Sequence, residues 1–167
     1  MLGSDNLGSI DVDIKVADIR ELSSLVFLNH ELFENEYLSV NPQFSNRKWL
    51  FDLNSKQYFS NMINNNYVLV AKLNNDVIGY LSGYIENENK VELEKNASIE
   101  NLYIKNSYRN LGIATKLINL FKNVCNNKKS ISNIKVKPNF NNQYLADFYT
   151  KNGFIKNEQQ QFMIEVW

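Results

Sequence analysis

The amino-acid sequence predicts an α/β fold of about seven strands and four helices in a single domain. Two kinds of segment follow one another along the sequence. In one kind apolar and polar residues alternate, as in strands, and in the other apolar residues recur at helical spacing. The predicted order of elements is β-α-α-β-β-β-α-β-α-β-β. The 167 residues are also enough for one hydrophobic core, because a chain of this length buries roughly 70% of its extended surface on folding.

The predicted domain covers residues 11–167 and follows a flexible tail, residues 1–10, in which glycine, serine and aspartate show no periodicity. Residues 12–16 alternate as a strand. Asp18 and Glu21 then have the spacing of a capping box, which indicates the start of the first helix.

Ser55 is expected to cap a second, short helix, because a serine hydroxyl can accept a hydrogen bond from the first helical turn. Residues 67–73 and 77–85 flank an Asn-Asn-Asp turn and predict a β-hairpin. A charged connection leads to the next strand, residues 98–104, and then to a helix whose apolar residues extend to Cys125. The last elements are expected to be a strand at 131–136, a helix at 142–152 closed by Gly153, and two short strands within 154–167.

Composition disfavours several functional classes. Lys and Arg together number 18, as do Asp and Glu, so the net charge is zero and nucleic acid is not an expected partner. Cys125 is the one cysteine, and its place on an apolar helical stripe favours buried packing over a nucleophile. No apolar run approaches the roughly 20 residues that span a membrane, and no signal peptide is recognised, so we expect a cytoplasmic protein without a membrane partner. No metal site is expected.

The most informative segment joins the strand at residues 99–104 to the helix that begins after Gly112. A strand that passes through a glycine turn into a helix leaves backbone N–H groups pointing outward at the positive end of the helix dipole. This arrangement favours a phosphate-bearing ligand. The segment contains neither G-x-x-x-x-G-K-[ST] nor G-x-G-x-x-G, so ATP and NAD are disfavoured.

Two motifs resemble those of the GCN5-related N-acetyltransferase (GNAT) superfamily. Residues 109–114, Arg-Asn-Leu-Gly-Ile-Ala, match the pattern Arg/Gln-x-x-Gly-x-Gly/Ala. Residues 146–154, Ala-Asp-Phe-Tyr-Thr-Lys-Asn-Gly-Phe, resemble the later block A-x-x-F/L-Y-x-K-x-G-F. The resemblance extends over about residues 14–166, and residues 112–120 also resemble bacterial aminoglycoside 3-N-acetyltransferases. It implies a mixed, mostly antiparallel sheet with helices on both sides.

The resemblance implies that the chain binds acetyl-CoA as its acetyl donor. The turn amides would hold the pyrophosphate beside Arg109, and the strand backbone near Leu102 would face the thioester carbonyl and pair with the pantetheine arm. Asn142 would be a further contact, with a helix cap as the alternative. The implied cofactor-binding residues are Leu102, Tyr103, Ile104, Arg109, Asn110, Leu111, Gly112, Ile113, Ala114, Thr115, Asn142 and Tyr149.

Two residues are candidates for proton transfer. Tyr149 matches the tyrosine that acts as general acid in the family, and the alternative is a core aromatic residue. Glu100 is the candidate general base because it lies on the strand beside the expected acetyl site, and the alternative is a surface ion pair or a substrate contact. Strict alternation would place Glu100 and Leu102 on one face of the strand. Ile99 and Tyr103 would then share the other face.

The expected acceptor is the primary amine of a small molecule, such as a polyamine, an aminoglycoside-like antibiotic or an amino-acid derivative. The alternatives are an enzyme that acetylates a protein N-terminus or lysine, and a non-catalytic acyl-CoA-binding module. Both a monomer and a homodimer are compatible with the sequence. Acidic residues that could attract a cationic amine, or form a solvated acidic face instead, are Glu31, Glu34, Glu36, Glu86, Glu88, Glu92 and Glu94.

Overall fold

The computed structural model describes residues 11–38, 48–65, 67–86, 95–128, 131–136, 143–157 and 161–166. Side chains are described for all of these residues except 36–38 and 48–53. The predicted tail at residues 1–10 and the predicted cofactor contact Asn142 lie outside these ranges. No described helix is both long enough and apolar enough to cross a membrane.

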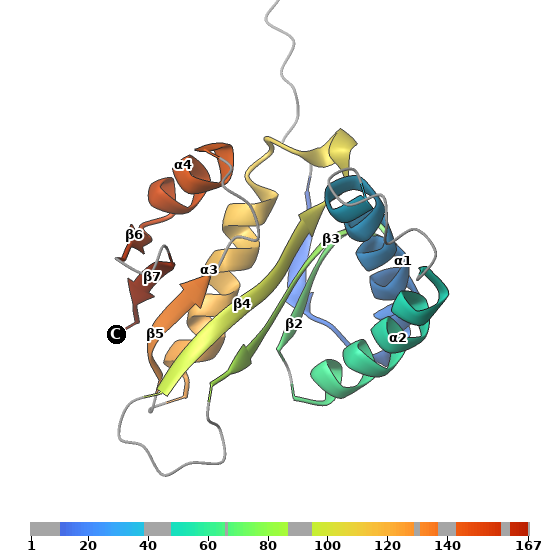
Figure 1. Ribbon diagram of the computed structural model, residues 1–167, viewed down its shortest axis with the longest axis horizontal. Helices are drawn as coiled ribbons and strands as arrows, with labels where there is room; N and C mark the ends of the chain where they lie inside the picture. Colours follow the sequence, from blue (N-terminus) through green and yellow to red (C-terminus); the bar gives the residue numbers. More distant parts are fainter. Residues whose placement is uncertain are drawn as a thin grey trace, which may run out of the picture.

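The described strands form one seven-stranded sheet in the order β1-β2-β3-β4-β5-β7-β6 (Figure 1). Neighbouring strands are antiparallel except β4 and β5, which are parallel. The mixed, mostly antiparallel sheet and the predicted order of elements are therefore confirmed. The strands are β1 (Asp13–Val16), β2 (Val68–Leu73), β3 (Asp76–Ile85), β4 (Lys95–Ile104), β5 (Ile131–Val136), β6 (Ile155–Lys156) and β7 (Phe162–Glu165).

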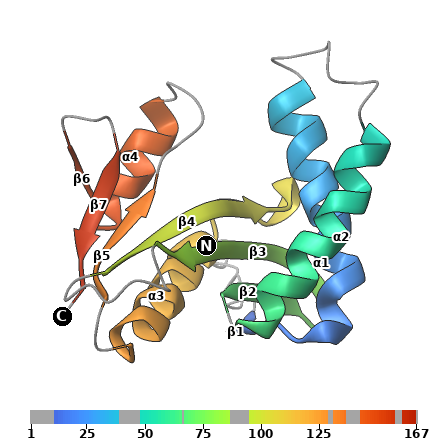
Figure 2. The same ribbon diagram turned by 60° about the horizontal axis from the view of Figure 1, so that its bottom comes forward.

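Helices cover both faces of the sheet, with α3 on one face and α1 and α2 on the other (Figure 2). Each face has its own hydrophobic core, one built around α3 and one around α1 and α2. Tyr149 and Phe148 of α4 join the core of α3. The α-helices of the described residues are α1 (Leu22–Leu32), which continues as the π-helical segment η2 (Phe33–Leu38), α2 (Lys48–Asn64), α3 (Ile113–Asn126) and α4 (Gln143–Lys151).

The apolar stripe predicted for α3 is the side that faces the sheet. Burial raises the pKa of the Cys125 thiol to about 12, so the thiol stays protonated and packs as an apolar group. The buried residues of the stripe are Ile113, Leu117, Ile118, Phe121 and Cys125.

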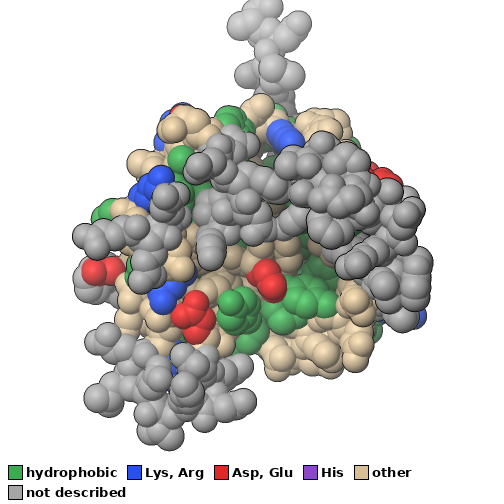
Figure 3. Space-filling view, in the orientation of Figure 1, with side chains coloured by type: hydrophobic (Ala, Val, Ile, Leu, Met, Phe, Trp, Pro, Cys, Tyr) green, Lys and Arg blue, Asp and Glu red, His purple; other side chains and the backbone are tan. Residues whose placement is uncertain are grey.

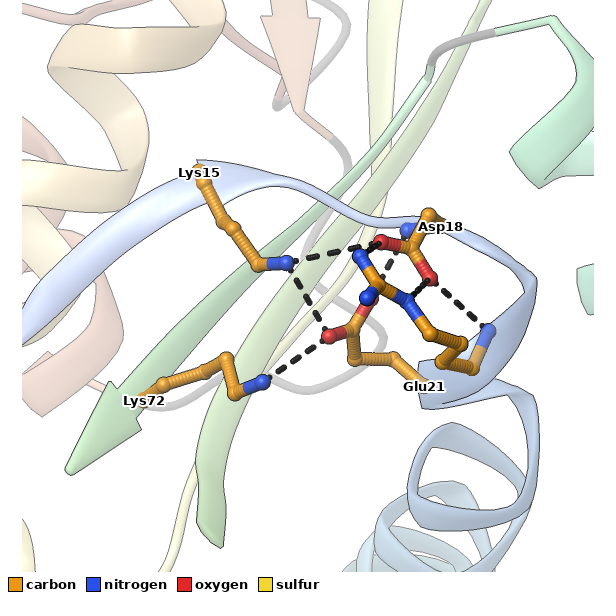
Figure 4. A network of polar contacts seen from close by, with 5 residues as sticks. Lys15, Asp18, Glu21 and Lys72 are labelled. Atoms are coloured by element: carbon orange, nitrogen blue, oxygen red, sulfur yellow. Dashed lines mark hydrogen bonds and ion pairs between the residues drawn. The ribbon is translucent and has the colours of Figure 1, made fainter. Parts of the chain in front are cut away.

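The predicted capping box forms around a short 3-10 turn, Ile19–Glu21, that leads into α1. The buried Glu21 Oε1 lies 3.0 Å from Lys72 Nζ and 3.1 Å from Lys15 Nζ, so the box also ties α1 to β1 and β2 (Figure 4). Burial alone would raise the pKa of Glu21. Hydrogen bonds from the Asp18 backbone N–H and from both lysines outweigh burial and hold that pKa below its usual value.

The prediction that Ser55 caps the second helix is wrong. The helix begins at Lys48, so Ser55 lies in its middle, where it is buried. Its Oγ accepts a hydrogen bond of 2.9 Å from Asn29 Nδ2, and Asn29 Oδ1 accepts one of 2.7 Å from Tyr80 Oη. Ser55 therefore joins α2 to α1 and β3 through buried polar contacts instead of satisfying a helix end.

Candidate active site

β4 separates from its parallel neighbour β5 halfway along its length. The pairing of the two strands begins at Lys95 and ends where Ile99 meets Val136, whereas β4 continues to Ile104 beside β3. Among the described residues, this last part of β4 has no strand partner on the β5 side. The backbone groups of this part that point away from β3 are therefore able to pair with an extended ligand, as in strand addition, apart from the Ile104 carbonyl, which accepts a hydrogen bond from Arg109.

A β-bulge lies at the point of separation. Ser82 of β3 pairs with Asn101, and the next residue, Gly83, pairs with Ile99, so Glu100 is the extra residue of β4. Bulges re-aim side chains and are common near active sites. Here the bulge marks the end of the pairing between β4 and β5.

The bulge overturns the expected alternation along β4. Ile99 packs in the core around α3, and Tyr103, four residues later, packs in the core around α1 and α2. Leu102 lies on the α3 side, whereas the Glu100 carboxylate accepts a hydrogen bond from Tyr58 of α2. Glu100 and Leu102 therefore face opposite sides of the sheet, because the extra residue shifts the alternation between them.

A cavity of about 630 Å³ opens beside the unpaired part of β4, between the N-terminus of α3 and α4. Its size falls in the range of ligand pockets. Its lining residues are Leu102, Ile104, Tyr108, Arg109, Asn110, Gly112, Ile113, Ala114, Thr115, Tyr144, Leu145, Phe148 and Tyr149.

The turn into α3 is built for close backbone approach. Gly112 is the N-cap residue with φ of 75°, and Asn110 also has a positive φ of 63°. Glycine adopts such angles without strain, and it has no side chain to cap the first-turn amides of α3. A Cβ at Gly112 would meet nothing within 4 Å, so the space in front of these amides is open to a ligand.

Arg109 is held at the edge of the cavity instead of extending freely into it. Its Nε donates a hydrogen bond of 2.9 Å to the Ile104 carbonyl, and its guanidinium lies 5.5 Å from the centre of the Tyr103 ring. Across the cavity mouth, Tyr144 Oη donates a hydrogen bond of 3.1 Å to Asn110 Oδ1 and so joins α4 to the turn. The cation is thus positioned near the turn by contacts with β4.

Tyr149 both lines the cavity and belongs to the core. It is 5% exposed, and its ring contacts those of Phe148, Phe154 and Phe162 with centroid distances of 5.2, 5.5 and 5.8 Å. These contacts fix the ring in the core around α3, and the side chain also lines the cavity. Its role as general acid stays a prediction.

A second cavity, of about 360 Å³, lies on the opposite side of β4, between that strand and helices α1 and α2. In the view of Figure 3, acidic side chains lie beside hydrophobic ones on the surface of the described residues. The lining of the cavity consists of Asn29, Leu32, Phe33, Asn54, Ser55, Tyr58, Glu100 and Asn101.

Glu100 is anchored in this second cavity by Tyr58. Tyr58 Oη donates to Glu100 Oε2 at 2.5 Å and lies 3.1 Å from Ser82 Oγ. Ser82 Oγ accepts a hydrogen bond of 3.1 Å from Asn101 Nδ2. Burial, followed by the hydrogen bond to the carboxylate, raises the pKa of Tyr58 well above its usual value. The phenol therefore keeps its proton at neutral pH.

Most of the predicted cofactor-binding residues lie together in the larger cavity. Two do not: the Tyr103 side chain packs on the other face, and Leu111 does not line the cavity and is 49% exposed. Asn142 lies outside the described residues.

The sequence analysis missed four lining residues, Tyr108, Tyr144, Leu145 and Phe148. Leu145 lies four residues before Tyr149, so the two share a side of α4. That spacing was an available signal for Leu145 alone. Tyr58 gave no signal, because its contact with Glu100 joins residues 42 positions apart.

The other acidic residues do not add to the second cavity within the described part of the chain. Glu34 lies 3.6 Å from His30 Nδ1, and Glu86 is paired with Lys135 at 3.2 Å. Glu31 is also absent from the lining residues. The side chains of Glu36, Glu88, Glu92 and Glu94 lie outside the described residues.

Residues 28–154 match the sequence model of the acetyltransferase (GNAT) family. The chain belongs to the GNAT acetyltransferase family. It is therefore an acetyl-CoA-dependent acyltransferase, as its motifs predicted. No curated protein matches its sequence.

Solved structures share the fold of this GNAT protein. The PaiA N-acetyltransferase from Thermoplasma acidophilum, in complex with coenzyme A, is 21% identical with a TM-score of 0.71, over 93% of this chain and 98% of that one. Arabidopsis thaliana Naa50, in complex with the bisubstrate analogue CoA-Ac-MVNAL, is 21% identical with a TM-score of 0.64, over 92% and 97%. The aminoglycoside acetyltransferase meta-AAC0020 from an uncultured soil metagenomic sample, in complex with sisomicin, is 21% identical with a TM-score of 0.61, over 84% and 86%.

The residues of the larger cavity fit acetyl-CoA. The open space before Gly112 and the uncapped amides of α3 suit a diphosphate, and the unpaired part of β4 suits an extended arm with amide groups. When bound, acetyl-CoA supplies the activated acetyl group as a thioester.

Proposed function

We propose that this GNAT acetyltransferase transfers the acetyl group of acetyl-CoA to the primary amine of a small molecule by direct attack. One observation carries the proposal: the bulge of β4 turns Leu102 toward the larger cavity and Glu100 toward the smaller one. The two residues are two positions apart, about 7 Å along a strand. An amine held at Glu100 and a thioester held near Leu102 would meet at the bulge.

Two side chains would move the protons. A primary ammonium cannot attack until it loses a proton, and Glu100 is placed to accept that proton. The amine nitrogen then bonds to the acetyl carbon and loses its second proton to solvent, the carbon–sulfur bond breaks, and the Tyr149 hydroxyl gives its proton to the leaving sulfur. Glu100 afterwards releases its proton to solvent and Tyr149 takes one from solvent, so each turnover releases one net proton. The backbone N–H near Leu102 would stabilise the charge that develops on the carbonyl oxygen.

The smaller cavity supports a small acceptor. Its 360 Å³ is near the lower end of the range for ligand pockets. Within its described lining Glu100 is the one carboxylate, and Leu32 and Phe33 provide apolar surface. This lining can neutralise one ammonium group, so it favours an amine with a single charge beside an apolar group over a polycation.

The test is thiol release from acetyl-CoA with a panel of amines. The panel contains phenethylamine, an amino-acid amide, spermidine, an aminoglycoside and a pentapeptide with a free N-terminus. We expect the first two to be acetylated with the highest kcat/KM. Preferred acetylation of the peptide would instead favour a protein N-terminal acetyltransferase, and binding of acetyl-CoA without thiol release with any of these amines would refute the proposed class of acceptor.

A further inference from the structure

A chain of hydrogen bonds with a defined direction ends at Glu100. A carboxylate can only accept, so Tyr58 donates its single hydroxyl proton to Glu100 Oε2. The contact of 3.1 Å between Tyr58 Oη and Ser82 Oγ then requires Ser82 to be the donor. Ser82 Oγ in turn accepts from Asn101 Nδ2, an amide nitrogen that can only donate. Every proton of the chain therefore points toward Glu100.

Residues from three secondary-structure elements form this chain of hydrogen bonds. Tyr58 lies on α2, Ser82 on β3, and Glu100 and Asn101 on β4. Ser82 is fully buried, and the Tyr58 ring packs edge-on against Phe59 with centroids 5.0 Å apart. The bulge brings Glu100 and Asn101 to the same side of β4, so both ends of the chain face the second cavity.

The two oxygens of Glu100 have different surroundings. Oε2 is held by Tyr58, whereas Oε1 has no hydrogen-bond partner among the described residues, and the side chain is exposed to the cavity. Glutamate has several rotatable bonds, and an exposed one samples several rotamers. The hydrogen bond from Tyr58 restricts that freedom and leaves Oε1 available to a ligand.

We propose that Tyr58 is a positioning residue, which orients the Glu100 carboxylate so that Oε1 faces the acceptor amine. This inference rests on the proposed function, because it assumes that Glu100 takes the proton of the amine. Tyr58 acts through Glu100, and Ser82 and Asn101 orient Tyr58.

The first test compares Tyr58→Phe with wild type in the amine panel. The substitution keeps the ring and removes the donor. We expect kcat to fall roughly tenfold to a hundredfold, the effect of losing one hydrogen bond to a charged group, while KM for acetyl-CoA stays unchanged. Tyr84→Phe on β3 is the matched control, because Tyr84 is exposed and lies outside both cavities, and it should behave as wild type.

The second test separates positioning from direct contact with the acceptor. If Tyr58 acts through Glu100, Tyr58→Phe has no further effect on kcat in a Glu100→Gln background. Losses that add in the double variant, or a Tyr58→Phe enzyme with the kcat of wild type, would overturn the inference while the proposed function stands. A folded wild type that releases thiol with none of the amines would overturn the proposed function, and the inference with it. Thermal unfolding of each variant shows that it is folded.

Discussion

Replacing Gly112 by aspartate tests where the diphosphate of acetyl-CoA binds. The residue has a φ of 75°, and a Cβ there meets nothing within 4 Å, so a side chain fits without a clash. Asparagine is the matched control, because it has the same shape as aspartate, lacks its charge and tolerates left-handed angles. The pair of variants therefore isolates the charge.

The expected loss of affinity follows from the repulsion between the new carboxylate and the diphosphate. Two unit charges about 4 Å apart repel by about 1 kcal/mol in water and about 4 kcal/mol at an effective dielectric constant of 20. These limits correspond to a dissociation constant raised about fivefold to several-hundredfold. The left-handed backbone costs both variants about 1 kcal/mol, so this strain cancels in the comparison.

The assay is calorimetric titration of acetyl-CoA into each folded variant at low and at high salt. Gly112→Asn should bind more weakly than wild type, because its side chain enters the open space and can cap the first-turn amides, and Gly112→Asp should bind more weakly still. The difference should shrink as salt screens the two charges. Equal dissociation constants for the aspartate and asparagine variants at low salt would refute the reasoning and place the diphosphate elsewhere.

Three other substitutions test the proton donor, the buried ion pair and a close contact of strand with helix. Tyr149→Phe should keep acetyl-CoA binding and lower kcat by roughly 10²- to 10⁴-fold, whereas unchanged turnover across pH would remove Tyr149 from the mechanism. Glu21→Gln should cost about 2 kcal/mol of unfolding free energy at pH 7. The lowered pKa of Glu21 means that this cost, measured by denaturant titration, should disappear as pH falls through that pKa. Gly83→Ala should lower the melting temperature, because its Cβ would lie 2.6 Å from Phe121 Cζ and 2.5 Å from the Ser98 carbonyl oxygen.

The sequence predicted the elements whose signals are local. The capping box at Asp18 and Glu21 and the glycine turn at Gly112 each depend on a few neighbouring residues, and both occur as predicted. Gly153, with φ of 87°, closes α4 for the same reason. The cavity beside Gly112 also follows from this local pattern, because the turn and the helix N-terminus determine where the amides point.

The second cavity could not be predicted, because it depends on contacts between distant segments. Ser55 has the side chain of a helix cap, but its Oγ accepts a buried hydrogen bond from Asn29, 26 residues away. Tyr58 has the spacing of an apolar helix residue, but its hydroxyl donates to Glu100, 42 residues away on β4. In each case the local pattern is compatible with several roles, and tertiary packing selects one.

The pattern of polar and apolar residues along β4 explains why the bulge occurs at Glu100. Ile99 and Tyr103 are four residues apart, so a regular strand would turn both toward the same face, yet they are buried in opposite cores. Without an extra residue, Asn101 would point into the apolar core of α3, where its amide would lose its partner Ser82. With the extra residue at Glu100, Tyr103 packs with α1 and α2 and Asn101 keeps its hydrogen bond. The burial of residues beyond the bulge thus stabilises the arrangement that turns the carboxylate toward the second cavity.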